Sequence, residues 1–197
     1  MTKIKILFVP FYRSYIRFTK ARMGCSYLSF LKFKLFGDEF YWIKGKSTIV
    51  VHPRKIFVGK NSPVGRFGGY FNGVGGINIG DYVQFGPNVS LISSNHDLYD
   101  HYKPEVGLPI VIENYCWIGI NSVVLPGVKL GPRTIVGSGS VVTKSFPDGY
   151  CVIGGVPAKL IKKIDKEKVV IPKFESEYYG FLTPDEFQRR RKEFLDI

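Results

Sequence analysis

A six-residue period dominates the second half of the chain. From Ile112 the sequence divides into IENYCW, IGINSV, VLPGVK, LGPRTI, VGSGSV and VTKSFP, and every segment begins with an aliphatic residue. The second residue is often glycine, and the fifth is small or β-branched in the first five segments. A period of six fits neither an α-helix nor an alternating strand. It is typical of short strands joined by tight turns, three to a coil, stacked as a parallel β-helix.

The same period is present upstream, in VGKNSP and VGRFGG from Val58 and in IGDYVQ, FGPNVS and LISSNH from Ile79. We expect the first residue of each segment to stack on its equivalent 18 residues later and to fill the axis of the coil. The following glycine would allow a positive φ or a close approach of the backbone at each corner. The sequence therefore predicts a mainly β fold, with one β-helix domain over residues 47–146.

Both ends of the chain leave the repeat. Residues 1–46 are basic and aromatic, and we predict an extension that caps the open end of the β-helix, with a segment resting on anionic lipid as the alternative. Residues 147–197 are predicted to form a C-terminal cap and a helical tail. There TPDE, from Thr183, is a capping box with proline at the first helical position, so a short helix should follow. Its inward residues should be Phe187, Phe194 and Leu195.

The composition limits the cellular setting and the partners. No apolar run approaches the 18 residues that a membrane-spanning helix needs, and the first residues lack the pattern of a signal peptide. Three cysteines without metal-like spacing suit a reduced cytoplasmic protein, in which they fill the core. The net charge of +12 favours solubility or an anionic partner. No recognition fold supports nucleic acid, so a membrane surface, an acidic polysaccharide or a phosphorylated cofactor remains.

The segment from Cys116, CWIGINSVVLPGVKLGPRTIVGSGSVVTKSFPDGYCVIGGVPAKLIKKI, resembles the hexapeptide-repeat acyltransferases. The branch it resembles contains the galactoside and maltose acetyltransferases and those of polysaccharide gene clusters, and the resemblance covers about residues 58–164. It implies a left-handed parallel β-helix, acetyl-CoA as acyl donor, and a sugar or glycan acceptor. It also implies a homotrimer with donor sites in the clefts between neighbouring subunits.

The repeat is interrupted at SSNHDLYDHYKPEVGLP, because Leu91 and Ile112 are 21 residues apart, which is not a multiple of six. A loop over residues 95–109 should therefore protrude, and long loops on a rigid scaffold tend to be functional. In the resembling family such a loop reaches toward the neighbouring subunit, and the catalytic histidine lies near its root. His96 matches that histidine. A neutral imidazole can take the proton of a sugar hydroxyl as it attacks a thioester.

Neighbours of His96 in sequence are candidates for the rest of the chemistry. A backbone N–H or the amide of Asn95 would stabilise the oxyanion. A backbone carbonyl or the carboxylate of Asp97, Asp100 or Glu105 would orient the imidazole, and the sequence does not choose among them. His101 is expected to be a loop residue or a substrate contact.

The glycine-rich segment GRFGGYFNGVGG, between Val64 and Ile79, is a second interruption. One interpretation is a bulge that lines the acceptor cleft, with Asn72 or Tyr70 contacting sugar hydroxyls, and the other is a bulge without function. In the galactoside enzymes that the chain resembles, an asparagine in a comparable coil contacts the acceptor.

The resemblance also implies a donor site. Trp117 matches a tryptophan beside the cleft, although a corner aromatic is the alternative. Gly119, Ser138, Thr143 and Lys144 match residues along the cofactor. Lys159 and Lys162 match basic residues at the phosphates, where lysine supplies charge without the two-pronged contact of arginine.

Three alternatives stay open at this point. The same histidine would serve N-acetylation of an amino sugar. A zinc hydratase of the γ-carbonic-anhydrase type would use His96, His101 and His52, but His101 falls in the irregular loop, so we expect no metal. The last alternative is a non-catalytic scaffold that binds sugar.

Overall fold

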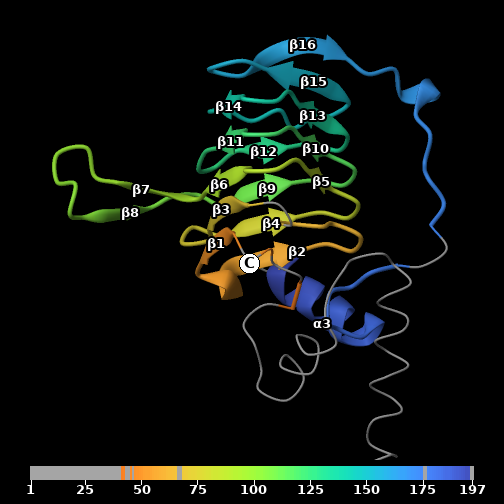
Figure 1. The fold of residues 1–197 in the computed structure, drawn as a ribbon, viewed down its shortest axis with the longest axis horizontal. Helices are drawn as coiled ribbons and strands as arrows, with labels where there is room; N and C mark the ends of the chain where they lie inside the picture. Colours follow the sequence, from red (N-terminus) through yellow and green to blue (C-terminus); the bar gives the residue numbers. More distant parts are fainter. Residues whose placement is uncertain (1–40, 43–44, 46, 66–67, 175–176, 196–197) are drawn as a thin grey trace, which may run out of the picture.

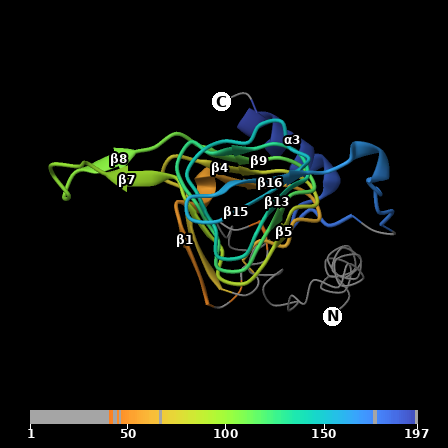
Figure 2. The same cartoon turned by 90° about the horizontal axis from the view of Figure 1, so that it is seen from above.

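Three flat faces, each a sheet of short strands, form a prism in the computed structural model, which describes residues 41–195 except 43–44, 46, 66–67 and 175–176 (Figures 1 and 2). The first face contains β1 (Thr48–Val51), β3 (Gly69–Asn72), β6 (Ser90–Ile92), β11 (Val123–Val124) and β14 (Val141–Val142). The second contains β2 (Ile56–Val58), β4 (Ile77–Ile79), β9 (Ile110–Ile112) and β12 (Lys129–Leu130). The third contains β5 (Gln84–Phe85), β10 (Trp117–Ile118), β13 (Thr134–Val136), β15 (Cys151–Gly154) and β16 (Lys159–Lys163).

The chain visits the three faces in turn and pairs each strand in parallel with the strand of the next coil. Only β16 joins its face antiparallel, folding back on β15. The predicted parallel β-helix is therefore confirmed. In the described part of the chain, no helix is both long and apolar enough to cross a lipid bilayer.

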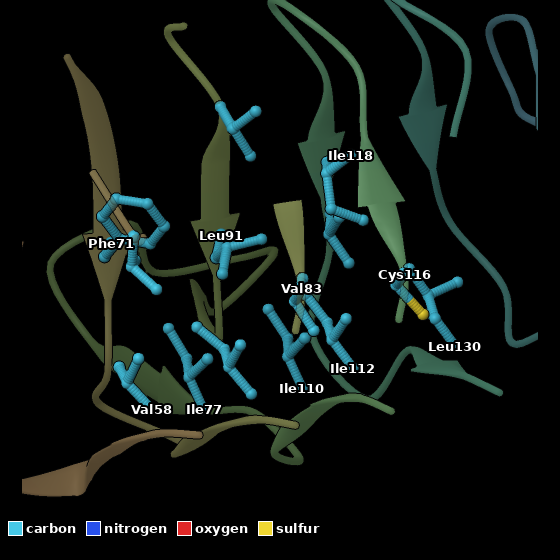
Figure 3. Packing of buried hydrophobic residues seen from close by; sticks show 14 of the residues in the cluster. Val58, Phe71, Ile77, Val83, Leu91, Ile110, Ile112, Cys116, Ile118 and Leu130 are labelled. Carbon is cyan, nitrogen blue, oxygen red and sulfur yellow. The ribbon is translucent and has the colours of Figure 1, made fainter. Parts of the chain in front are cut away.

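The predicted core residues fill the axis of the coil (Figure 3). Ile79, Ile112 and Leu130 stand in register on three successive coils, and each is at most 1% exposed. The fifth residues of the repeat are also buried, namely Cys116, Ser122, Val128, Thr134 and Ser140. Burial of an aliphatic side chain of this size contributes about 1.5–3 kcal/mol, so the column is the main source of stability.

At the corners, close approach of neighbouring coils and positive φ occur at two different positions of the repeat. At the second position, a Cβ on Gly119 would lie 2.6 Å from the backbone nitrogen of Ser138, so this glycine serves close approach. Positive φ falls instead at the fourth position, which is Tyr115, Asn121, Gly127, Arg133 and Gly139 in successive segments. Glycine at the second position therefore reflects coil-to-coil contact rather than left-handed backbone.

The second interruption of the repeat is not a bulge at Tyr70 and Asn72. Both residues lie on β3, which pairs with β1 and with β6 in regular parallel register. Their side chains stand on the outer surface of the first face, because Phe71 between them is buried in the core. The bulge interpretation is therefore wrong for these two residues.

The helix α3 (Pro184–Leu195) packs under the coil that contains β2 (Figure 1). Phe187 is fully buried, and its ring lies 5.6 Å from that of Phe57, with Phe194 at 5.5 Å from the same ring. Glu186 accepts a hydrogen bond from the backbone of Thr183 and donates its own N–H to the Thr183 hydroxyl, so the predicted capping box is present. The inward prediction holds for Phe187 and Phe194, while the side chain of Leu195 lies outside the described part.

A C-terminal segment, residues 164–182, runs from β16 back to α3 along the corner between the second and third faces (Figure 1). We call this corner the tail edge. The segment contains one short 3-10 turn, η2 (Lys166–Lys168), and a second such turn, η1 (Pro53–Lys55), precedes β2. The predicted N-terminal extension, residues 1–46, falls mostly outside the described residues, although Tyr41 and Trp42 are buried.

Candidate active site

The interruption at residues 93–109 forms a protruding hairpin, which we call the arm, at the corner between the first and second faces (Figures 1 and 2). Its strands β7 (Ser94–His96) and β8 (Pro104–Val106) pair antiparallel. The insertion is visible in the register of the second face: Ile79 is paired with Ile112, whereas Ile112 is paired with Leu130 at the regular spacing. The predicted protrusion is present, and it is an ordered hairpin rather than an irregular loop.

Both strands of the arm leave the prism through a closely packed root. A Cβ on Gly75 would lie 2.2 Å from the carbonyl oxygen of Ser93 and 2.4 Å from that of Gly107. Only glycine fits between the outgoing and returning strands at this point. The corner side chain Ser93 is fully buried, whereas Asn95 and His96 further along are exposed.

His96 presents its imidazole to solvent on β7, opposite Pro104 on β8. A solvent-facing imidazole can accept a proton from an incoming group, which suits the predicted role. Asp97 has a different local function: its Oδ1 accepts hydrogen bonds from the backbone of Tyr99 and of Asp100, at 2.8 and 2.9 Å. It therefore shapes the tip of the hairpin. That Asp97 orients His96 stays a prediction, as does an oxyanion role for Asn95.

The remaining predicted donor residues are distributed over two corners. Trp117 lies on the third face, where its side chain is 56% exposed, in register with Gln84 and Ile135. Gly119 and Ser138 follow at the corner between the third and first faces, where they lie on adjacent coils and contact each other. Because the arm leaves the corner between the first and second faces, one chain does not bring His96 next to Trp117 on the third face.

Thr143 and Lys144 share the corner of the arm, one coil beyond Gly127, and both are exposed. Lys159 and Lys162 lie on β16 at the far end of the stack, also exposed. Tyr70 and Asn72 lie on the first face, on the side of the arm root, and His101 is exposed at the arm's tip. The predicted donor residues thus lie on the third face and at the two corners that flank the first face, and they do not meet at one point.

The side chain of Asn72 is already engaged at the arm root. Its Nδ2 donates to the Ser94 hydroxyl at 2.9 Å, and its Oδ1 accepts from the backbone of Val74 at 3.0 Å. The importance of Ser93 and Ser94 escaped the sequence reasoning. The available signal was a pair of serines directly at the break, at the third and fourth positions of LISSNH, where the repeat does not require small residues.

The histidines and cysteines form no metal centre among the residues that the structure describes, since no three His, Cys, Asp or Glu side chains gather there. Cys116 and Cys151 are buried, as predicted for core-filling cysteines, and Cys25 lies outside the described residues. Burial raises the pKa of the Cys116 thiol to about 12, so this thiol is not a nucleophile at neutral pH.

The fold and the arm define a class of protein: a parallel β-helix with an ordered hairpin at one corner, on which His96 and His101 are exposed. Residues 109–144 match the family described as bacterial transferase hexapeptide (six repeats). The chain is 32% identical to a maltose O-acetyltransferase from Clostridium difficile of known structure, with a TM-score of 0.54 over 64% of this chain and 71% of that one. The chain belongs to the hexapeptide-repeat transferase family.

Two curated relatives differ in the reaction that their names state. The galactoside O-acetyltransferase of Escherichia coli is 38% identical over 96 residues, which are 47% of this chain and 47% of that protein. A 2,3,4,5-tetrahydropyridine-2,6-dicarboxylate N-acetyltransferase of Enterococcus faecalis is 48% identical over 63 residues, 32% of this chain and 27% of that protein. The chain spans about half the length of the first curated relatives it matches.

Proposed function

We propose that this protein is an acetyl-CoA-dependent O-acetyltransferase that acetylates a sugar hydroxyl. The observation that carries the proposal is the exposed imidazole of His96 on an ordered arm. The β-helix from which this arm projects is similar to that of a maltose O-acetyltransferase. A rigid support is what a catalytic base needs, because proton transfer depends on hydrogen-bond distance to the reacting hydroxyl.

In this mechanism the neutral imidazole of His96 accepts the proton of the acceptor hydroxyl as its oxygen attacks the thioester carbonyl. The C–S bond then breaks, and the proton held by the imidazolium is available to the departing thiolate. A backbone N–H or the side-chain amide of Asn95, the residue directly before His96 on the same exposed strand, is the candidate donor to the oxyanion. This step requires His96 to be neutral, so the rate should fall when the imidazole is protonated.

The residues predicted for the donor suit a long, phosphorylated molecule. Lys159 and Lys162 are exposed and supply positive charge for phosphates. Nothing lies within 4 Å of a Cβ built on Gly139, beside the exposed Ser138, so backbone groups of this corner are open to an amide-containing chain. In this proposal Trp117 flanks the same path on the third face.

The site is proposed to be completed by a second copy of the chain in a homotrimer. His96 extends from the corner between the first and second faces, whereas Trp117 lies on the third face next to the corner that contains Gly119, so a neighbour is needed to bring one subunit's arm to another's donor residues. The first face lies between these corners. Its strands, TIVV, GYFN, SLI, VV and VV, contain no charged residue, which suits an interface.

The experiment that tests the proposal measures release of CoA thiol from acetyl-CoA with a panel of acceptors. The panel contains galactosides, maltose, amino sugars and oligosaccharides, and mass spectrometry with mild base treatment separates esters from amides. We expect thiol release that depends on a hydroxyl acceptor and yields a base-labile ester. Absence of acceptor-dependent release across the panel would contradict the proposal.

N-acetylation of an amino sugar is the second candidate, favoured by the 48% identity to the Enterococcus faecalis relative. A base-stable amide product on the amino sugars would identify it. We further propose a cytoplasmic enzyme of polysaccharide or glycan biosynthesis, in which the basic N-terminal extension caps the β-helix and contact with the inner face of the membrane is the alternative. Sedimentation with anionic liposomes, with and without residues 1–40, tests that contact.

A further inference from the structure

We propose that Ser93 is a positioning residue for His96, acting together with Asn72 and Ser94. The inference rests on the proposed function, because it assigns the residue that aims the proposed base. None of these three side chains needs to touch a substrate in this role. They fix the direction in which the arm leaves the prism.

The Ser93 hydroxyl joins the start of the arm to two points of the corner that follows β3. Ser93 Oγ donates to the carbonyl oxygen of Asn72 at 2.5 Å, and it accepts from the backbone of Gly75 at 2.9 Å. The backbone of Ser93 also donates to Asn72, at 3.1 Å. Ser93 itself is 0% exposed. Loss of the hydroxyl would remove the side-chain partner of the Gly75 N–H and one of the two hydrogen bonds to the Asn72 carbonyl at the base of the arm.

A second tie holds the next residue along the arm. Asn72 Nδ2 donates to Ser94 Oγ at 2.9 Å, and Asn72 Oδ1 accepts from Val74 at 3.0 Å. The amide therefore bridges the corner after β3 to the first residue of β7. Ser94 precedes His96 by two residues on the same strand, about 7 Å of chain at the usual rise.

The position of His96 depends on this root because the hairpin has few other contacts. Beyond the root, the described residues 98–106 are all exposed. The displacement of an atom in a rotating hairpin grows with its distance from the point of rotation. A small rotation at Ser93 therefore moves the His96 imidazole further than it moves the residues at the root. Misplacement of a catalytic group by about 1 Å costs about 100-fold in rate.

The chain provides a matched control at the tail edge. Ser62 is 1% exposed, and its Oγ donates to the carbonyl of Gly80 at 2.8 Å and accepts from the backbone of Val83 at 3.0 Å. The same arrangement therefore exists at a corner that carries no arm. Substitution at Ser62 measures the general cost of losing a buried corner hydroxyl.

The test measures the arm and the rate separately on Ser93→Ala and Ser62→Ala. Spin labels at Tyr99→Cys, on the arm, and Lys129→Cys, on the second face, report their distance distribution by pulsed electron resonance. The labelled chains carry Cys25→Ser and are diluted with unlabelled protein. We expect Ser93→Ala to broaden this distribution and to lower kcat at least tenfold. Ser62→Ala should lose similar thermal stability and leave both readouts within twofold of the parent.

Asn72→Ala and Ser94→Ala keep the test decisive if Ser93→Ala does not fold. If Asn72 acts through Ser94, the two single variants and the double variant lose the same factor in kcat, with the acceptor KM unchanged. An additive loss, with a raised acceptor KM for Asn72→Ala alone, would make Asn72 a substrate contact and overturn its positioning role.

Two results separate this inference from the proposed function. An unchanged distance distribution and kcat in Ser93→Ala would overturn the inference while acetyl transfer stands. A broadened distribution in a protein that transfers no acetyl group would support Ser93 as the determinant of arm direction and refute the proposed function.

Discussion

The arm edge and the tail edge of the same prism carry opposite kinds of surface. At the tail edge, Tyr82 and Tyr115 from successive coils stack at 4.8 Å, and Phe174 of the C-terminal segment stacks on Tyr82 at 5.0 Å. The Arg133 guanidinium lies 4.7 Å from the Tyr115 ring and donates to the carbonyl of Val170. At the corner between the first and second faces, which we call the arm edge, a hairpin projects instead, and Thr143 and Lys144 are exposed one coil beyond Gly127.

The difference teaches how one repeat supports two tasks. Both edges are built on the same buried aliphatic column, so most of the stability comes from the column and less from the side chains at the corners. Aromatic residues at the fourth position of the repeat make the tail edge a binding surface for the chain's own C-terminal segment. Residues at the arm edge stay available to other molecules. Predictions that separate activity from stability test this division.

His96→Ala should have the largest effect. We expect kcat to fall by about 10²–10⁴-fold, the usual contribution of a general base. The melting temperature should stay unchanged, because the side chain is exposed. Steady-state thiol release and thermal unfolding measure the two quantities. His101→Ala, at the tip of the same arm, is the control and should lose far less activity; an equal loss in both variants would assign the effect to the arm as a whole.

Phe187→Ala tests the converse case, a change that should affect stability and leave activity intact. Removing this fully buried ring from beneath the β-helix should lower the free energy of unfolding by about 3–5 kcal/mol. Urea unfolding followed by circular dichroism measures it. At a temperature where the variant is folded, its kcat should match the parent. A large loss of kcat in folded protein would mean that α3 supports the arm as well as the end of the stack.

Arg133→Ala should destabilise the tail edge by a smaller amount, about 1 kcal/mol. The variant loses a cation–π contact and a hydrogen bond to the C-terminal segment, both at the protein surface. Faster hydrogen exchange in residues 170–174 would localise the loss. Lys129→Ala, exposed on the second face, serves as control and should leave this exchange unchanged. Equal exchange rates in both variants would contradict the role of Arg133 in holding the C-terminal segment against the tail edge.

Glu177 should give the smallest effect, and one that depends on pH. The hydrogen bond from Lys60 lowers the pKa of this carboxyl to about 2, with further help from Tyr179 and Tyr82. A lowered pKa stabilises the folded state above the unfolded value near 4.5, and that contribution is lost as the pH falls toward 2. The stability difference between the parent and Glu177→Gln should therefore vanish between pH 4.5 and pH 2. The effect should be small because the side chains of Lys60 and Glu177 are both partly exposed. A stability difference between the two proteins that persists at pH 2 would exclude this ion pair as its cause.

The sequence predicts the β-helix well because its core repeats every six residues, and each predicted first residue from Ile112 to Val142 is buried. It predicts that an arm leaves after Leu91, but not that the arm is a hairpin, because SNH and PEV have no alternating apolar pattern. The contact between Arg191 and Asp81 joins residues 110 positions apart, and no local pattern encodes it. For the same reason the serine bonds at the arm root were invisible before the fold was known.

Binding of acetyl-CoA to the parent and to His96→Ala tests the central claim most directly. Thermal unfolding of both proteins is followed with and without the donor. A ligand that binds only the folded state stabilises it by mass action, by about 2.7 kcal/mol at a concentration 100 times its Kd. We predict the same stabilisation in both proteins, with acetyl transfer lost only in His96→Ala. No stabilisation in either protein would contradict the donor assignment and, with it, the proposed acetyltransferase.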